Sequence, residues 1–309
     1  MSQWSILGSG VTALCAATVL YEHGERIEII EQPTRVAASH WAGGMLAPYC
    51  EAEAAPAYIT EQSLSSIAWW QTHCQTVHQA GSLVVAAARD QHELKRFASR
   101  TQAYEWLNPA DKEPDLAHFA KALYFPTEAH LDPRLAMQEL KEKLIQAGVN
   151  IHQGPPTAKI IDCRGIAAKE IQPQLRAVRG EMLILDNPYL TLQRPIRLLH
   201  PRFPCYLVPR GQGRFMLGAT MVETEQESPI TARSMMELLS AAYTIHPSFA
   251  DASIIETGVG FRPAYPDNIP KLQYVEGRYV LNGMYRHGFL FAPVLAQQLI
   301  QHIQGHKND

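Results

Sequence analysis

The hydrophobic pattern at the start of the chain predicts a strand, a tight turn, a helix and a second strand. A short strand at residues 5–7, with apolar residues at positions 6 and 7, leads into the glycine-containing segment 8–10. An apolar helical run follows over residues 14–21. A second strand, with three isoleucines and one glutamate, occupies residues 27–30. This order of elements is typical of a dinucleotide-binding unit, although an ordinary strand-turn-helix segment has the same outline.

The residue types in this opening unit support the dinucleotide-binding interpretation. Gly8 permits a tight turn, Gly10 lets a pyrophosphate approach the backbone, and Ala13 is small enough for the helix to pack closely on the strand. The N-terminus of the helix offers unpaired N–H groups and a positive dipole end. Glu31 follows the second strand, where its carboxylate can accept hydrogen bonds from ribose hydroxyls and would repel a 2′-phosphate. The motif therefore argues against NADP without identifying the dinucleotide.

The rest of the chain alternates between helical and strand patterns. Helices are predicted at residues 58–77, 90–101, 134–147, 232–244 and 289–304. Strands are predicted at residues 81–87, 123–126, 149–151, 158–165, 179–185, 205–210, 215–221, 254–263 and 279–281. Asp90 is the expected N-cap of the second of these helices, and Asp132 with Pro133 opens the third. Residues 205–221 read as a hairpin around a glycine turn, and residues 158–165 as a central parallel strand whose carboxyl end faces a ligand.

Small residues dominate the stretch from residue 38 to residue 48. Two adjacent glycines, Gly43 and Gly44, precede an apolar pair and a proline. Such a stretch fits a loop and short strand that lie against a flat ring, where bulky side chains would block the approach. A surface turn is the alternative interpretation, although surface turns rarely carry tryptophan, methionine and leucine together.

Composition limits the possible classes of protein. The chain has 309 residues with 46% hydrophobic content, enough for a large core and two interleaved domains. The formal charge is −3 and no basic run occurs, so a nucleic-acid partner is not expected. No apolar stretch is long enough for a membrane span, and the first strand begins too early for a signal peptide, so we expect a cytoplasmic protein. The five scattered cysteines predict reduced thiols, with neither a disulfide nor a metal site.

Five stretches together carry a resemblance to a known family. They are the opening glycine turn with Glu31, residues 38–48, residues 206–210 with 218–221, residues 260–263, and residues 282–293. In this order the chain resembles the D-amino-acid oxidase family of flavoproteins, and within it is most similar to the glycine oxidases of thiamine biosynthesis. The resemblance implies an α/β fold with a Rossmann-like FAD-binding domain of the glutathione-reductase type and an interleaved, β-rich α+β substrate domain. The expected FAD-binding domain comprises residues 1–50, 130–180 and 255–309, and the substrate domain comprises 51–129 and 181–254.

The resemblance also implies the cofactor and the residues that bind it. FAD is expected rather than NAD, because a second helix N-terminus near residue 288 can stabilise negative charge on a reduced flavin. The expected cofactor-binding residues are Gly8, Gly10, Ala13, Glu31, Ser39, Ala42, Gly43, Gly44, Met45, Leu46, Gly165, Gly283, Tyr285, Arg286, His287, Gly288, Phe289 and Leu290.

The implied reaction is oxidation of a small amino acid or amine. Arg262 matches the arginine that binds the substrate carboxylate, and Tyr206, Met221 and Arg286 match other residues of the pocket. The family mechanism transfers hydride from the α-carbon to flavin N5, gives an imine that hydrolyses, and passes electrons to molecular oxygen. It uses no general base, so we assign none.

Two departures from the family pattern keep alternative functions open. The connection at residues 152–157 replaces a longer β-rich insertion, which leaves the adenine side of the cofactor more open. Met284 and His287 stand where glycine oxidases usually carry histidine and asparagine. The alternatives to a glycine oxidase are a flavoenzyme for another amine or a partner-protein side chain, and a binding subunit with little turnover. The sequence leaves a homo-oligomer or a protein partner possible.

Overall fold

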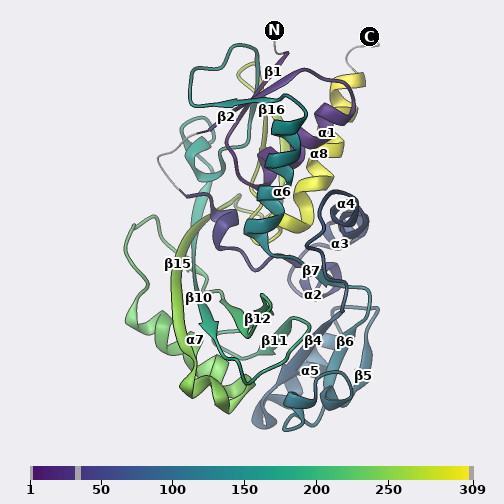
Figure 1. The fold of residues 1–309 in the computed structure, drawn as a ribbon, viewed down its shortest axis with the longest axis vertical. Coiled ribbons are helices and arrows are strands. Elements are labelled where there is room, and N and C mark those ends of the chain that lie inside the picture. The colour runs from purple at the N-terminus through teal and green to yellow at the C-terminus, as the bar shows by residue number, and fades with distance from the viewer. Residues whose placement is uncertain (1–2, 32–35, 306–309) are drawn as a thin grey trace.

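A computed structural model describes residues 3–31 and 36–305. It contains a six-stranded sheet, at the top of Figure 1, in the order β16-β17-β9-β1-β2-β8. All neighbours in this sheet are parallel except the edge pair of β16 and β17. Its strands are β1 (Trp4–Leu7), β2 (Ile27–Ile30), β8 (Asn150–His152), β9 (Lys159–Asp162), β16 (Lys271–Val275) and β17 (Arg278–Asn282). The predicted opening unit and the predicted central strand near residue 160 are therefore confirmed.

Three helices pack beside this sheet. They are α1 (Val11–Glu22), α6 (Pro133–Gln146) and α8 (Gly288–Gly305), and α1 lies between the other two (Figure 1). The predicted start of α6 is confirmed, because Asp132 Oδ1 accepts hydrogen bonds from the N–H groups of Arg134 and Leu135. Residues 11–20 of α1 are all buried, so this helix forms the centre of the layer.

A larger sheet of nine strands lies at the other end of the molecule (Figure 1). Its strands are β4 (Ser82–Ala86), β5 (Glu105–Leu107), β6 (Ala122–Phe125), β10 (Arg176–Asp186), β11 (Ile196–Leu199), β12 (Cys205–Pro209), β13 (Arg214–Gly218), β14 (Val222–Glu223) and β15 (Ser253–Ala264). β12 and β13 form the predicted hairpin. The long strands β10 and β15 pair along most of their length and cross the expected domain limits at residues 180/181 and 254/255.

Shorter elements complete the fold. α5 (Gln91–Ala98) and α7 (Ala232–Ile245) accompany the larger sheet, and β3 (Met45–Leu46) pairs with β7 (Ala129–His130). α5 ends three residues earlier than predicted, and Asp90 stands at its N-cap without a side-chain hydrogen bond to the helix. The 3₁₀ helices are η1 (Ala38–Trp41), η2 (Ala88–Asp90), η3 (Pro109–Asp111), η4 (Pro114–Leu116), η5 (Gly165–Glu170) and η6 (Pro247–Asp251).

The prediction of one long helix over residues 58–77 is wrong. This segment forms two helices, α3 (Ala57–Ser63) and α4 (Ser66–His73), which follow the short helix α2 (Pro48–Glu51). Ser63 Oγ donates to the carbonyl of Thr60, and Ser66 Oγ donates to the carbonyl of Leu290 on α8. Serine hydroxyls compete with the helical hydrogen-bond pattern, and the contact with α8 fixes the second helix separately.

The short connection before β9 is held by a buried carboxylate. Glu28 Oε1 accepts hydrogen bonds from both the N–H and the hydroxyl of Thr157, and Ser5 Oγ accepts one from the N–H of Ala158. His152 Nε2 lies 3.3 Å from Glu28 Oε2. Burial opposes ionisation of Glu28, but hydrogen bonds from Ser5 and Thr157 lower its pKa to about 2. A compact polar cluster therefore occupies the place where an insertion was expected.

Two expectations from composition can be compared with this structure. Cys15, Cys50, Cys74, Cys163 and Cys205 are all buried and free, as predicted. No helix in residues 3–31 and 36–305 has the length and apolar character needed to cross a membrane.

Candidate active site

One cavity brings together most of the residues singled out in the sequence. It is lined by the turn after β1, the stretch from residue 36 to 45, the end of β9, parts of β10, β12 and β15, and the start of α8. The predicted residues that line it are Gly8, Gly10, Ser39, Ala42, Gly43, Gly44, Met45, Gly165, Tyr206, Met221, Arg262, Tyr285, Arg286, Gly288 and Phe289. Segments more than 250 residues apart in the sequence thus face one space.

The glycine turn after β1 has the expected geometry. Gly8 has a φ of +106°, and a Cβ at this position would lie 2.9 Å from the carbonyl oxygen of Cys163. Gly10 caps α1 without a side-chain hydrogen bond, and Ser39 Oγ accepts a bond from the N–H of Val11. The start of α1 therefore reaches the cavity with a positive dipole end and free backbone donors.

A second helix begins at the same cavity. Gly288 starts α8, and a Cβ there would lie 3.6 Å from Val11 Cγ1, so the two helix starts are neighbours. Neither helix carries an acidic residue in its first turn. Two adjacent helix N-termini without acidic side chains suit a ligand that carries two negative groups, one near the start of α1 and one near the start of α8.

The glycine pair has two different functions. A Cβ at Gly43 would meet only side-chain atoms, at 3.7 Å or more, so packing does not require a glycine there. Its lack of a side chain leaves more room in the cavity. Gly44 has a φ of +69°, and a Cβ there would overlap the carbonyl oxygen of Leu131. Close packing against the segment that follows β7 and a left-handed backbone thus require the second glycine, in addition to the predicted approach of a flat ring.

Six predicted cofactor residues lie outside the cavity lining. They are Ala13, Glu31, Leu46, Gly283, His287 and Leu290. Ala13 and Leu46 are fully buried in the core, and Gly283 has a φ of +76° and packs against the ring of Tyr265. Lys141 Nζ lies 2.7 Å from Glu31 Oε1, and the carbonyl of Leu290 accepts the bond from Ser66. The structure thus places these residues behind the lining or beside it.

Arg262 presents a half-buried positive charge to the cavity. Its Nη1 donates to the carbonyl of Thr220 at 3.0 Å, and its guanidinium lies over Gly180 on the neighbouring strand. Burial, together with the nearby Arg286, lowers the pKa of Arg262 to about 10, so the group is charged at neutral pH. Within the described part of the chain, no carboxylate lies within ion-pairing distance of this guanidinium. An anionic ligand is therefore the partner that this position lacks.

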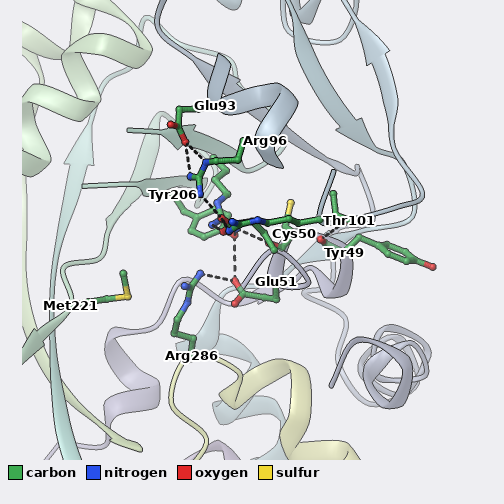
Figure 2. A network of polar contacts seen from close by, with 12 residues as sticks. Tyr49, Cys50, Glu51, Glu93, Arg96, Thr101, Tyr206, Met221 and Arg286 are labelled. Carbon is green, nitrogen blue, oxygen red and sulfur yellow. Dashed lines mark hydrogen bonds and ion pairs between the residues drawn. The ribbon is translucent and has the colours of Figure 1, made fainter. Parts of the chain in front are cut away.

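A polar network next to Arg262 was not predicted. Glu51, at the end of α2, accepts hydrogen bonds at Oε1 from Arg286 Nη2 at 3.2 Å and from the Tyr206 hydroxyl at 3.3 Å (Figure 2). Arg197 on β11 donates to the same hydroxyl at 2.8 Å. Burial of Glu51 opposes ionisation, but Arg286, His287 and Arg197 lower its pKa below the ordinary value. In the sequence, the position of Glu51 at the end of the apolar stretch after the glycine pair was the one sign that this acid belongs to the site. No pattern in the sequence indicated Arg197.

Met221 and Tyr285 meet at the edge of the cavity. The Tyr285 hydroxyl lies 3.5 Å from Met221 Sδ, and Met221 is 45% exposed. Figure 2 shows Met221 apart from Glu51 and Arg286, with no dashed line joining it to either. The predicted pocket residue Met221 therefore stands at the mouth of the cavity and not in its interior.

Comparison with known proteins identifies the family. A family model described as FAD dependent oxidoreductase matches residues 3–302. The chain belongs to this family. It is similar to a protein of Rhizobium etli named putative thiamine biosynthesis oxidoreductase ThiO, with 47% identity over 96% of this chain and 94% of the relative.

Solved structures of FAD-dependent oxidoreductases share the fold. The chain superposes on glycine oxidase from Geobacillus kaustophilus with a TM-score of 0.82, covering 96% of this chain and 93% of that one at 21% identity. Iminodiacetate oxidase from Chelativorans sp. BNC1 gives a TM-score of 0.84, covering 98% and 95% at 23% identity. The fold of this FAD-dependent oxidoreductase is therefore the mixed α/β fold of these oxidases.

The cavity fits the FAD that the family uses. The turn after β1 and the start of α1 offer backbone donors for a pyrophosphate, and the start of α8 offers a second positive end. Between these two helix starts, Ala42 and Gly43 line the cavity without large side chains, so they leave room for a flat ring. Of the two departures from the glycine oxidase turn, Met284 lines the cavity, whereas His287 lies behind Glu51, with its Nδ1 3.6 Å from Oε2.

Proposed function

We propose that this FAD-dependent oxidoreductase oxidises glycine or another small amino acid at the carbon next to the amine. The observation that carries this proposal is Arg262, a half-buried guanidinium without an acidic partner in the described residues, in the cavity where the two helix N-termini meet. A planar guanidinium binds a carboxylate through two parallel hydrogen bonds and so fixes its orientation. The names of the relatives, ThiO, glycine oxidase and iminodiacetate oxidase, support the same class of substrate.

The residues of the chain position the substrate and the cofactor. FAD, when bound, accepts the hydride that leaves the α-carbon. Arg262 would hold the carboxylate, and the Tyr206 hydroxyl, which receives a hydrogen bond from Arg197, would stand beside it. The first turn of α1 would hold the pyrophosphate, and the first turn of α8 would favour negative charge at the flavin. Orientation of this kind supplies much of the rate enhancement when the cofactor performs the chemistry.

Several finer assignments belong to this proposal. We assign residues 1–50, 130–180 and 255–309 to an FAD-binding domain of the glutathione-reductase type, and residues 51–129 and 181–254 to a substrate domain. Molecular oxygen is the proposed acceptor, and the likeness to ThiO supports a place in thiamine biosynthesis. Five buried free thiols support a reducing compartment such as the cytoplasm.

The test is anaerobic reduction of the FAD-loaded protein by a panel of small amines. Glycine, sarcosine, iminodiacetate and D-alanine are added separately, and loss of the visible flavin absorption is followed. We expect bleaching by at least one of them. The substitution Arg262→Ala should weaken binding of that substrate by about 2–5 kcal/mol, because the charge pair between the guanidinium and the substrate carboxylate is lost. Arg262→Lys should restore only part of the loss.

A matched control is Arg233→Ala, which removes an exposed arginine at the start of α7. This variant should bleach at the rate of the unmodified protein. A protein that retains FAD and is bleached by none of the amines would overturn the proposed function. Equal bleaching of the Arg262→Ala variant would remove Arg262 from the substrate site.

A further inference from the structure

The cavity next to the glycine turn carries an uneven distribution of charge. Among the described residues that line it, Glu51 is the one acid, whereas Arg164, Arg197, Arg262 and Arg286 are cationic. Arg164 is neutralised by Asp162 and Glu170, and Arg197 by Glu53, neither pair needing a ligand. The charges that face a small ligand are therefore chiefly Arg262, Arg286 and Glu51.

Glu51 is a buried carboxylate with acceptor capacity to spare. The residue is only 7% exposed, yet its Oε1 receives two long hydrogen bonds and its Oε2 receives none from the described residues. His287 Nδ1 lies 3.6 Å from Oε2 and is also without a hydrogen-bond partner among the described residues. Burial and the nearby Arg286 lower the pKa of His287, whereas Glu51 raises it, so burial opposes a positive charge on this ring. A buried, ionised carboxylate normally accepts several short hydrogen bonds.

We infer that Glu51 binds the ammonium group of the substrate. The inference rests on the proposed function, because it takes the ligand of Arg262 to be an amino acid. A zwitterion presents one anion and one cation, and the cavity offers a cation without an acid partner at Arg262 and an acid short of donors at Glu51. The ammonium is a compact donor that can supply the missing hydrogen bonds. Glu51 thereby makes the site specific for amino acids over carboxylic acids that lack an amine.

The arrangement around Glu51 orients this carboxylate from two sides. Arg286, in the turn before α8, and Tyr206, on β12, both donate to Oε1 (Figure 2). Arg197 donates to the tyrosine hydroxyl and so holds it in place. The two donors fix the carboxylate without saturating it. The ammonium of the ligand is therefore placed relative to Arg262 by three elements that meet only in the folded protein.

Glycine and propionate form the matched pair of ligands for a test. They have the same size and the same carboxylate, and differ in an ammonium against a methyl group. Binding is measured by calorimetry on the FAD-loaded protein kept reduced and anaerobic, so that glycine is not consumed. We expect the unmodified protein to bind glycine at least 10-fold more tightly than propionate. Glu51→Gln should raise the dissociation constant of glycine at least 10-fold and change that of propionate less than 3-fold.

Glu53→Gln is the matched control. Glu53 lies two residues away and forms an ion pair with Arg197, but it does not line the cavity. This variant should keep the preference for glycine. Equal weakening of both ligands by Glu51→Gln would show that Glu51 only maintains the shape of the pocket, and would overturn the inference.

The unmodified protein also tests the inference without any variant. If it binds glycine no more tightly than propionate, Glu51 does not recognise an ammonium group. The outcome is separate from that of the bleaching experiment. A protein that prefers glycine in calorimetry but is bleached by no amine would retain this inference while the proposed oxidation fails.

Discussion

The guanidinium of Arg262 on β15 occupies the space that a side chain at Gly180 on β10 would need. A Cβ at position 180 would lie 2.5 Å from Arg262 Cζ. Arg262 pairs directly with Val178, so its side chain leans across the strand to the position two residues further along. The absence of a side chain at Gly180 on β10 thus sets the position of the Arg262 charge.

Replacement of Gly180 by alanine should therefore displace Arg262. We expect Gly180→Ala to raise the dissociation constant of propionate and of glycine by about 10-fold or more, because a bidentate contact tolerates little displacement. Calorimetry on the reduced protein measures both constants, and FAD content provides the control for folding. Unchanged affinity for both ligands would show that the displaced guanidinium binds the carboxylate equally well from another position, and would contradict this prediction.

Gly8 and Gly24 form a matched pair for the glycine turn. Both have positive φ, +106° and +78°, but only Gly8 has the carbonyl of Cys163 in the way of a Cβ, whereas Gly24 has open space. Gly24→Ala should cost about 1–2 kcal/mol in free energy of unfolding from backbone strain alone. Gly8→Ala should cost more and should also lower FAD affinity, as measured by fluorescence titration. Equal effects of the two substitutions would exclude a specific function for the turn.

Glu28 should stabilise the connection before β9 in a pH-dependent manner. The pKa of this carboxyl is about 2 in the folded protein, below its ordinary value of 4.5. Its contribution is therefore present above about pH 4.5 and is lost as the pH falls toward 2. We expect Glu28→Gln to lower the free energy of unfolding by about 3 kcal/mol at pH 7, from the size of the shift.

Urea unfolding at pH 7 and at lower pH measures this contribution. The difference between Glu28→Gln and the unmodified protein should shrink as the pH falls below 4.5. Glu61→Gln, at an exposed position on α3, is the control and should leave the free energy of unfolding nearly unchanged. A constant difference across the whole pH range would contradict the proposed role of the ionised carboxylate.

Glu128 should have the opposite pH dependence. It is fully buried next to Ser82 and accepts a hydrogen bond from the N–H of Cys50, and burial raises its pKa to about 7. A raised pKa means that the stabilising contribution is complete below about pH 4.5 and is lost as the pH rises through 7. The unmodified protein should lose about 3 kcal/mol from this group over that range.

The substitution Glu128→Gln tests this dependence. In the structure Glu128 accepts at both oxygens, from the N–H of Cys50 and from the hydroxyl of Ser82. A glutamine can accept from Cys50 with its amide oxygen, and its NH2 group can donate to the oxygen of Ser82, so it substitutes for the neutral acid. Its melting temperature should therefore fall less between pH 5 and pH 8 than that of the unmodified protein. Parallel melting curves for the two proteins would show that Glu128 does not titrate in this range.

Local features of the fold could be predicted because they depend on neighbouring residues. The turn at Gly8, the cap of Asp132 on α6 and the hairpin of β12 and β13 each follow from residue types a few positions apart. The break between α3 and α4 could not be predicted in this way, because the bond from Ser66 reaches Leu290. Periodicity records which face of a helix is apolar, and it does not record a hydrogen bond to a distant element.

The order of residues along the chain, by itself, determined a dinucleotide-binding unit and a set of residues that share one site. Tertiary structure alone decided how those residues meet. Glu51 reaches Arg286 across 235 positions, and Gly180 makes room for Arg262 on a paired strand. Such contacts depend on how whole strands and helices pack, since loop closure and strand register bring together groups that have no local relation.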